Sequence, residues 1–219
     1  LLIDSGDAPV EERELRQMIA RIGEYRESYE SNRYKAEIES LEADAKAKKK
    51  EGVTEEQKKQ LRSQIAEEAK NIYYSTDIAS GVLSYYLAEH VIRGGTASAD
   101  PMEILRGEGA LFSLYRDALV RFTRALAFAE AQPSKRLAVR LLLNVAEVQT
   151  RIGKIQEAYE TLTRAETMAK KHSYLDITWV VYGRMGEFLE RDGRAVEGAG
   201  HQSLAGQYFT KAFDEIEEC

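Results

Sequence analysis

Residues 139–165, VRLLLNVAEVQTRIGKIQEAYETLTRA, predict two short helices that fold back on each other. Gly153 separates them, because glycine adopts the left-handed conformation that ends a helix at little cost. Ala146 in the first helix and Ala158 in the second are small enough to let two antiparallel helices approach closely. Larger apolar residues at helical spacing fill the space around this contact: Leu142, Val145 and Leu162.

A second copy of this pattern follows closer to the C-terminus. Residues 179–193, WVVYGRMGEFLERDG, place five residues at the same offsets: Tyr182, Met185, Gly186, Leu189 and Gly193. Residues 195–203, AVEGAGHQS, then interrupt the pattern before it resumes at Ala205, Phe209 and Ala212. Because insertions in helical repeats map to loops, we interpret this interruption as a loop insertion of about seven residues.

An earlier, partial copy of the pattern ends in Ala118, Phe122 and Ala125. We expect its first helix within residues 76–95, TDIASGVLSYYLAEHVIRGG, and a long connection over residues 94–109. The repeated unit is therefore irregular in length.

These features resemble the tetratricopeptide repeat (TPR), a helical hairpin with small and large residues at fixed offsets. Gln149 stands where the family has Tyr, and Leu162 stands where it has Phe. The resemblance implies an all-α fold, a short TPR-like solenoid of antiparallel helical hairpins, and a binding scaffold rather than a catalyst. We expect this region over residues 76–219, with a clear repeat at about 139–172 and degenerate repeats at about 76–131 and 179–219.

The N-terminal part, residues 1–75, predicts a long helical hairpin that precedes the repeats. An apolar stripe at helical spacing runs through a helix expected over residues 9–51: Leu15, Met18, Ile19, Ile22, Tyr25 and Tyr29. Gly52 ends this helix, and Thr54 with Gln57 forms a capping box that starts the next one. Acidic residues flank the lysines of the hairpin tip, which we interpret as a solvated surface: Lys46, Lys48, Lys49 and Lys50.

Composition narrows the classes of function. The 219 residues carry a formal charge of -6, which argues against a general nucleic-acid binder, because phosphate contacts need a basic surface. No apolar run approaches the roughly 20 residues of a membrane span. The sequence starts LLIDSGDAP, without a complete signal peptide and without Met, so both a cytoplasmic protein and an exported mature form stay open.

The sequence shows no motif for enzyme chemistry. The three histidines, His90, His172 and His201, are not spaced as metal ligands on one helix, and the single cysteine, Cys219, has no nearby histidine. We therefore expect a protein that is not an enzyme and that has no metal and no cofactor.

The TPR resemblance implies a binding groove lined by the polar face of the first helix of each hairpin. Carried over to this chain, the groove residues are Arg140, Asn144, Glu147, Arg151, Arg184, Glu187 and Arg191. Asn144 and Arg184 resemble two parts of the clamp that holds a C-terminal carboxylate in some family members. Val180 stands where that clamp has a lysine, so we do not expect a complete clamp.

The expected function is a protein–protein interaction scaffold or adaptor that binds a protein or peptide with an acidic or mixed-charge segment. Two alternatives stay open. One is a small-molecule or transporter-associated binding protein with its ligand between the helices. The other is an oligomerising structural protein that self-associates through the long N-terminal helix, over residues 15–41. For the groove residues themselves, ion pairs between exposed side chains are the alternative to binding.

Overall fold

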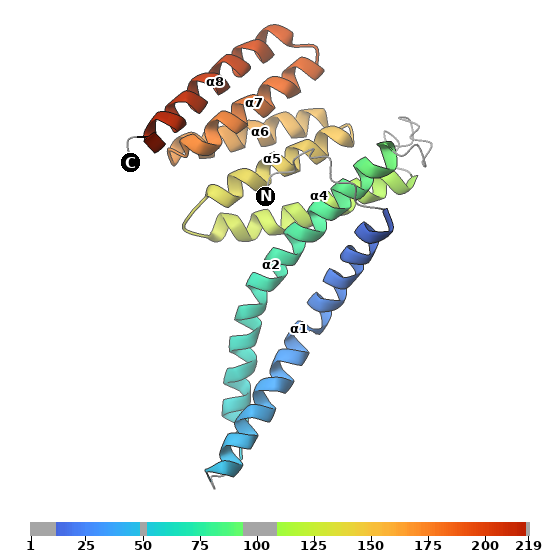
Figure 1. Ribbon diagram of the computed structural model, residues 1–219, viewed down its shortest axis with the longest axis vertical. Helices are drawn as coiled ribbons and strands as arrows, with labels where there is room; N and C mark the ends of the chain where they lie inside the picture. Colours follow the sequence, from blue (N-terminus) through green and yellow to red (C-terminus); the bar gives the residue numbers. More distant parts are fainter. Residues whose placement is uncertain (1–11, 49–51, 94–108, 218–219) are drawn as a thin grey trace.

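The computed structural model describes residues 12–48, 52–93 and 109–217, and this part of the chain is all-α (Figure 1). The helices are α1 (Glu12–Ala47), α2 (Glu55–Arg93), α4 (Gly109–Ala131), α5 (Arg136–Arg151), α6 (Ile155–Lys171), α7 (Leu175–Arg191) and α8 (Ala195–Glu217). Helices α4 to α8 form a stack with the C-terminal half of α2. From this stack the hairpin of α1 and α2 projects as a long arm.

The arm begins its second helix at the predicted capping box. The Thr54 backbone N–H donates to Gln57 Oε1 at 2.9 Å, and the Gln57 backbone N–H donates to Thr54 Oγ1 at 3.2 Å. These reciprocal bonds satisfy two of the amide groups that a helix start leaves unpaired. The helix expected over residues 9–51 corresponds to α1. Residues 9–11 and 49–51 of that prediction, which include Lys49 and Lys50, lie outside the described part of the chain.

Amphipathic side chains such as Tyr73 link α1 and α2 along the arm. Of the predicted apolar stripe only Leu15 is buried, whereas Met18 and Tyr25 are about half exposed. Farther along the arm the Tyr73 hydroxyl donates to Glu30 at 2.7 Å. The arm therefore buries little apolar surface, as its sparse apolar positions predict.

The expected division between residues 75 and 76 falls inside α2, which runs for 39 residues without a break. Thr76, Asp77 and Ser80 continue the helix, and all three are buried against the stack. These three polar residues lie on the face of α2 that meets other helices. Helix α2 thus belongs both to the arm, with α1, and to the first hairpin of the stack, which it forms with α4.

Two turns of the stack share one geometry, 40 residues apart. Gly153 and Gly193 have φ angles of +77° and +79°. The Lys154 amide donates to Gln149 O at 2.8 Å, and the Arg194 amide donates to Leu189 O at 2.8 Å. This is the glycine-based Schellman ending of a helix, so the sequence correctly predicts both turns.

The predicted loop insertion over residues 195–203 is wrong, because α8 begins at Ala195 directly after the turn. Gly198 follows Gly193 by five residues, as Ala158 follows Gly153. A Cβ on Gly198 would lie 3.0 Å from the carbonyl oxygen of Gly186, closer than side chains normally approach. The glycines in this segment therefore permit helix contact rather than forming a loop.

The same close approach occurs in the first hairpin of the stack. A Cβ on Gly81 of α2 would lie 2.8 Å from Cε1 of Phe122 in α4. Phe122 is fully buried, as are the predicted small residues on either side of it, Ala118 and Ala125. One continuous apolar core extends from here through α5 and α6 to α7.

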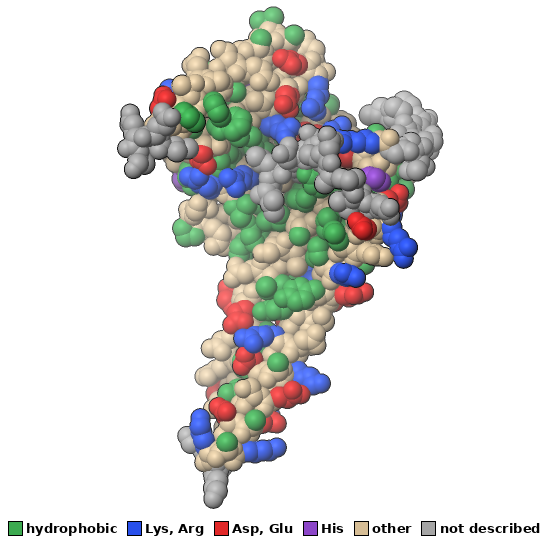
Figure 2. Space-filling view, viewed as in Figure 1, with side chains coloured by type: hydrophobic (Ala, Val, Ile, Leu, Met, Phe, Trp, Pro, Cys, Tyr) green, Lys and Arg blue, Asp and Glu red, His purple; other side chains and the backbone are tan. Residues whose placement is uncertain are grey.

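The surface of the arm carries both signs of charge interspersed (Figure 2). In the described ranges, no helix combines the length and the apolar composition that crossing a membrane requires.

We expect Ala158→Leu to destabilise the protein by about 1–3 kcal/mol, because Ala158 is fully buried and a larger side chain would force α5 and α6 apart. Thermal denaturation measures the change. Ala127→Leu is the matched control, since Ala127 is exposed on α4. Equal melting temperatures for the two variants would contradict close packing at this position.

Candidate functional site

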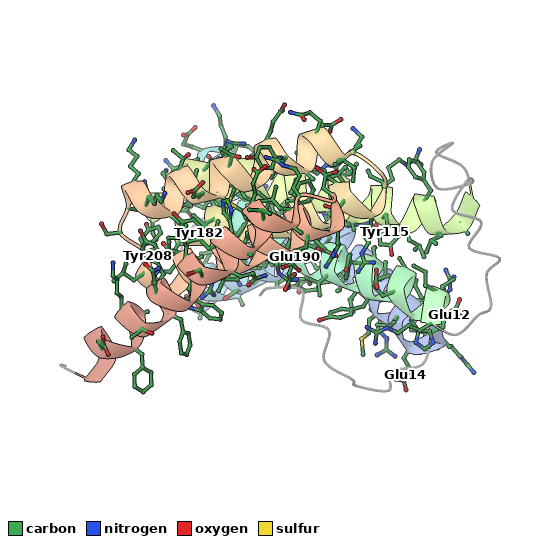
Figure 3. The ribbon with its side chains drawn as sticks, turned by 90° about the horizontal axis from the view of Figure 1, so that it is seen from above. Glu12, Glu14, Tyr115, Tyr182, Glu190 and Tyr208 are labelled. Atoms are coloured by element: carbon green, nitrogen blue, oxygen red, sulfur yellow. The ribbon has the colours of Figure 1, made fainter. Side chains whose placement is uncertain are left out.

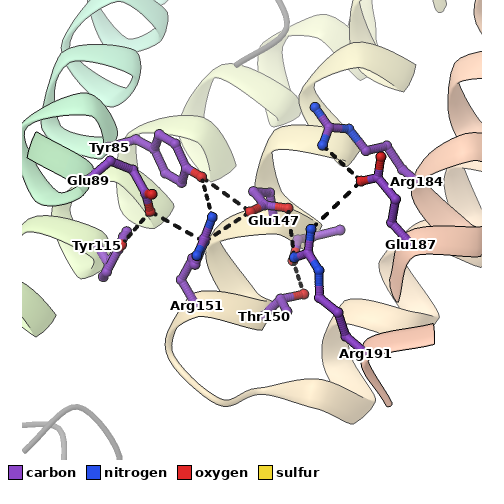
Figure 4. A network of polar contacts seen from close by, with 10 residues as sticks. Tyr85, Glu89, Tyr115, Glu147, Thr150, Arg151, Arg184, Glu187 and Arg191 are labelled. Carbon is purple, nitrogen blue, oxygen red and sulfur yellow. Dashed lines mark hydrogen bonds and ion pairs between the residues drawn. The ribbon is translucent and has the colours of Figure 1, made fainter. Parts of the chain in front are cut away.

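A network of charged and tyrosine side chains crosses four helices of the stack (Figure 4). At its centre, Arg151 of α5 places its Nε 3.0 Å from Glu147 Oε1 and 3.3 Å from Glu89 Oε1 of α2. The Glu147 and Glu89 side chains are each only 16% exposed. Burial opposes the charge on Arg151, but the neighbouring Tyr85, Glu89 and Glu147 outweigh it and raise the pKa of the guanidinium above its usual value.

Two buried tyrosines complete the network on the α2 side. The Tyr115 hydroxyl of α4 donates to Glu89 at 2.6 Å, and the Tyr85 hydroxyl of α2 donates to Glu147 at 3.2 Å. Burial raises the pKa of both hydroxyls well above the ordinary value for tyrosine, and the adjacent carboxylates raise it further. Both hydroxyls therefore keep their protons and act as hydrogen-bond donors at any physiological pH.

The network continues to α7 through weaker and more exposed contacts. Arg191 Nη1 lies 4.0 Å from Glu147 Oε2, and Arg191 Nη2 lies 3.7 Å from Glu187 Oε2. Arg184 donates from Nη1 to the same Glu187 oxygen at 3.2 Å. The three α7 side chains in these contacts, Arg184, Glu187 and Arg191, are 35–50% exposed. The resulting row alternates in sign: Glu89, Arg151, Glu147, Arg191, Glu187 and Arg184.

The structure brings five of the predicted groove residues into this row: Glu147, Arg151, Arg184, Glu187 and Arg191. Asn144 is instead only 2% exposed and belongs to the packed interior. Arg140 is half-buried, and its Nε is a buried donor that finds no hydrogen-bond partner within the described residues. The cations of this row contact its anions, as in the ion-pair alternative that the sequence left open for these residues.

Sequence reasoning did not find Tyr85, Glu89 and Tyr115 as members of this site. Tyr85 serves both the core and the network, because its ring is buried and its hydroxyl donates to Glu147. Tyr85 and Glu89 are four residues apart on one helix face, which is a weak local signal. Their partner Glu147 is 62 residues away from Tyr85, a pairing that no local pattern reveals.

A second polar cluster joins the arm to the stack. Asp77 of α2 has a side chain that is only 5% exposed; Arg26 of α1 donates to it, and Arg121 of α4 lies 3.9 Å away. Arg121 also donates to Asp117 at 2.8 Å, and Ser84 donates to the same carboxylate at 2.8 Å. A buried carboxylate needs such partners, so this cluster fixes how α1 lies against α2 and α4.

An open cleft of about 700 Å³ lies beside that cluster, between α1, α2 and α4. Its wall is apolar and its rim carries arginines: Ile19, Leu87, Leu114, Val120, Arg16 and Arg116. The crevice between α5 and α7 at the charged row holds only about 10 Å³, the space of one water molecule. Space for a small molecule therefore exists at the cleft and not at the row.

Comparison with known proteins gives no match to a protein family, to a curated protein or to a solved structure. Within the described ranges, no three His, Cys, Asp or Glu side chains come together in a group that could hold a metal ion.

We expect Arg151→Ala to destabilise the protein by about 2 kcal/mol, because it leaves two mostly buried carboxylates without their shared cation. Arg184→Ala should change the stability by less than about 0.5 kcal/mol, since its pair with Glu187 is exposed. Urea denaturation measures both. A larger loss for Arg184→Ala would mean that the α7 end of the row is structural.

Replacement of Asp77 by Ala should cost about 3 kcal/mol, because Arg26 and Arg121 then lose their buried counter-ion. Asp44→Ala serves as the control, since its pair with Lys48 lies in solvent and contributes little. The free energy of unfolding of each variant is compared with that of the parent. Equal values for the two variants would show that Asp77 does not anchor the arm.

Proposed function

We propose that this protein is a TPR-like helical-repeat scaffold, without enzyme activity, that binds a partner protein through the charged row across α2, α5 and α7. The proposal rests on one observation: the side chains of that row become more exposed from its α2 end to its α7 end. Its α2 end is mostly buried and fixed by tyrosines, whereas its α7 end leaves Arg184 and Arg191 35% and 50% exposed. A rigid base that presents half-exposed charges is the arrangement that favours specific recognition.

The alternation of charge in the row favours a partner of mixed charge. A purely acidic peptide would meet Glu147 and Glu187 next to every arginine it approached. A segment with both signs can pair with the arginines and the glutamates together, through charge-assisted hydrogen bonds. The partner then exchanges the long Arg191 contacts of 3.7 Å and 4.0 Å for shorter ones.

The TPR-like part of the proposal is supported by the packing of small residues within each hairpin. Ala146, Ala158, Gly186 and Gly198 are buried where paired helices meet. The spacing of 40 residues between Gly153 and Gly193 is longer than the 34 residues typical of the family. The resemblance therefore lies in the hairpin packing and the turn, and the helices are longer.

Charge reversal at the exposed end of the row tests the proposal. We expect the double variant Arg184→Glu, Arg191→Glu to lose at least tenfold in affinity for a partner captured by the parent protein from native lysate and identified by mass spectrometry. Its melting temperature should stay near that of the parent, because both side chains are at the surface.

The matched control carries the same two charge changes at exposed positions outside the row, Arg124 of α4 and Lys171 of α6. The control should bind the partner normally. If both double variants bind equally well at low salt, where exposed charges are least screened, the row is not the binding surface.

Small-molecule binding is a second candidate, favoured by the cleft of about 700 Å³ between α1, α2 and α4. A cavity of this size with an apolar wall and a few polar groups suits a small organic molecule. Ligand screening by thermal shift, repeated with Ala20→Trp to fill the cleft, separates this candidate from the first. A ligand whose effect survives the substitution does not bind there.

A further inference from the structure

The cleft between α1, α2 and α4 has an apolar floor at the place where the arm begins. There the N-terminal part of α1, whose first turn carries Glu12 and Glu14, lies beside the C-terminal part of α2 (Figure 3). Leu15 of α1 packs on Leu87 and Val91 of α2 and forms a small core with them. Because α1 and α4 both pack on α2 but not extensively on each other, a space of about 700 Å³ remains between them.

Apolar side chains on both sides of this cleft stay accessible. Val120 of α4 is 42% exposed, and Ile19 of α1 and Leu114 of α4 are only half-buried. A ligand with an apolar body would cover all three, and each methylene group that it buries raises the affinity by up to about fourfold. The cleft therefore favours a ligand with a hydrocarbon body.

One cation of the cleft has no counter-ion within the described part of the chain. Arg116 of α4 is exposed, and no hydrogen bond, ion pair or ring contact links it to another residue there. The neighbouring Asp117 does not pair with it, because the Asp117 carboxylate accepts from Ser84 and from Arg121, each at 2.8 Å. Arg116 can therefore receive a negatively charged group of a ligand, through charge-assisted hydrogen bonds.

The other two charges of the lining limit that group to a single negative charge. Arg16 of α1 also lines the cleft, and its pair with Glu12 at 2.8 Å is exposed, so an anion can attract it. Asp117 lines the cleft as well and repels a second negative charge. A carboxylate, with one charge, thus suits the cleft better than a phosphate monoester, which carries about two.

We propose that this cleft binds an amphipathic carboxylate, with its hydrocarbon chain along Ile19, Leu114 and Val120 and its carboxylate at Arg116. The proposal rests on the second candidate function, small-molecule binding in the cleft, and adds the class of ligand. A ligand bound between α1 and α4 fastens the beginning of the arm to the stack. Binding should therefore raise the melting temperature of the protein.

Octanoate is the probe, with octanol and acetate as its matched controls. Octanol keeps the chain without the charge, and acetate keeps the charge without the chain. Isothermal titration calorimetry at neutral pH and low salt should give octanoate a dissociation constant below about 1 mM. Octanol should bind about tenfold more weakly, because it lacks the charge-assisted bond, and acetate should not bind measurably.

Arg116→Gln tests the position of the carboxylate. It should lower the affinity for octanoate about tenfold, to the level of octanol, because it removes the cation that has no other partner. Arg124→Gln is the matched control on the same helix, since Arg124 is exposed and is not part of the cleft lining. Arg124→Gln should bind octanoate as the parent does. Both variants should melt like the parent without ligand, because both side chains are at the surface.

The results separate the ligand class from the cleft itself. Equal affinities for octanoate and octanol, or unchanged octanoate binding in Arg116→Gln, overturn the proposal. If Ala20→Trp still abolishes that binding, the cleft does bind small molecules and only the carboxylate is wrong. Octanoate that binds Ala20→Trp as tightly as the parent lies elsewhere, which also overturns the proposal. If octanoate does not bind at all, the proposal fails, and the ligand screen decides the candidate function on its own.

Discussion

Each hairpin of the stack depends on one point where its two helices approach more closely than ordinary side chains allow. Gly81 against Phe122, and Gly186 against Gly198, leave no room for a Cβ without displacement of a neighbour. Ala146 and Ala158 take the same places in the hairpin between them, and both are buried. Because the helices meet so closely here, the larger apolar residues above and below interlock and form the continuous core.

Contacts between hairpins follow a different principle from contacts within them. Small residues join the two helices of a hairpin, whereas tyrosines, arginines and glutamates join one hairpin to the next. Tyr85 of α2 reaches Glu147 of α5, and Tyr182 of α7 reaches Glu166 of α6. A tyrosine suits this place because its ring extends the core while its hydroxyl satisfies a carboxylate at the edge. The contacts between hairpins are thus amphipathic.

The parts of the fold that follow from local chemistry could be predicted from the sequence. The capping box at Thr54 and the turn at Gly153 depend on residues less than six positions apart. The predicted insertion over residues 195–203 was wrong because glycine has two uses, and spacing alone does not separate a loop from a close helix contact. Tyr85 and Asp77 could not be predicted as site residues, because their partners Glu147 and Arg26 are more than 40 residues away.

At the α2 end of the stack, the arm packs on the first hairpin, and the buried cluster of Arg26, Asp77 and Arg121 holds it there. A carboxylate that is only 5% exposed, as that of Asp77 is, needs cations beside it to stay charged in the interior. Because Arg26 comes from α1 and Arg121 from α4, this one carboxylate ties the arm to the stack.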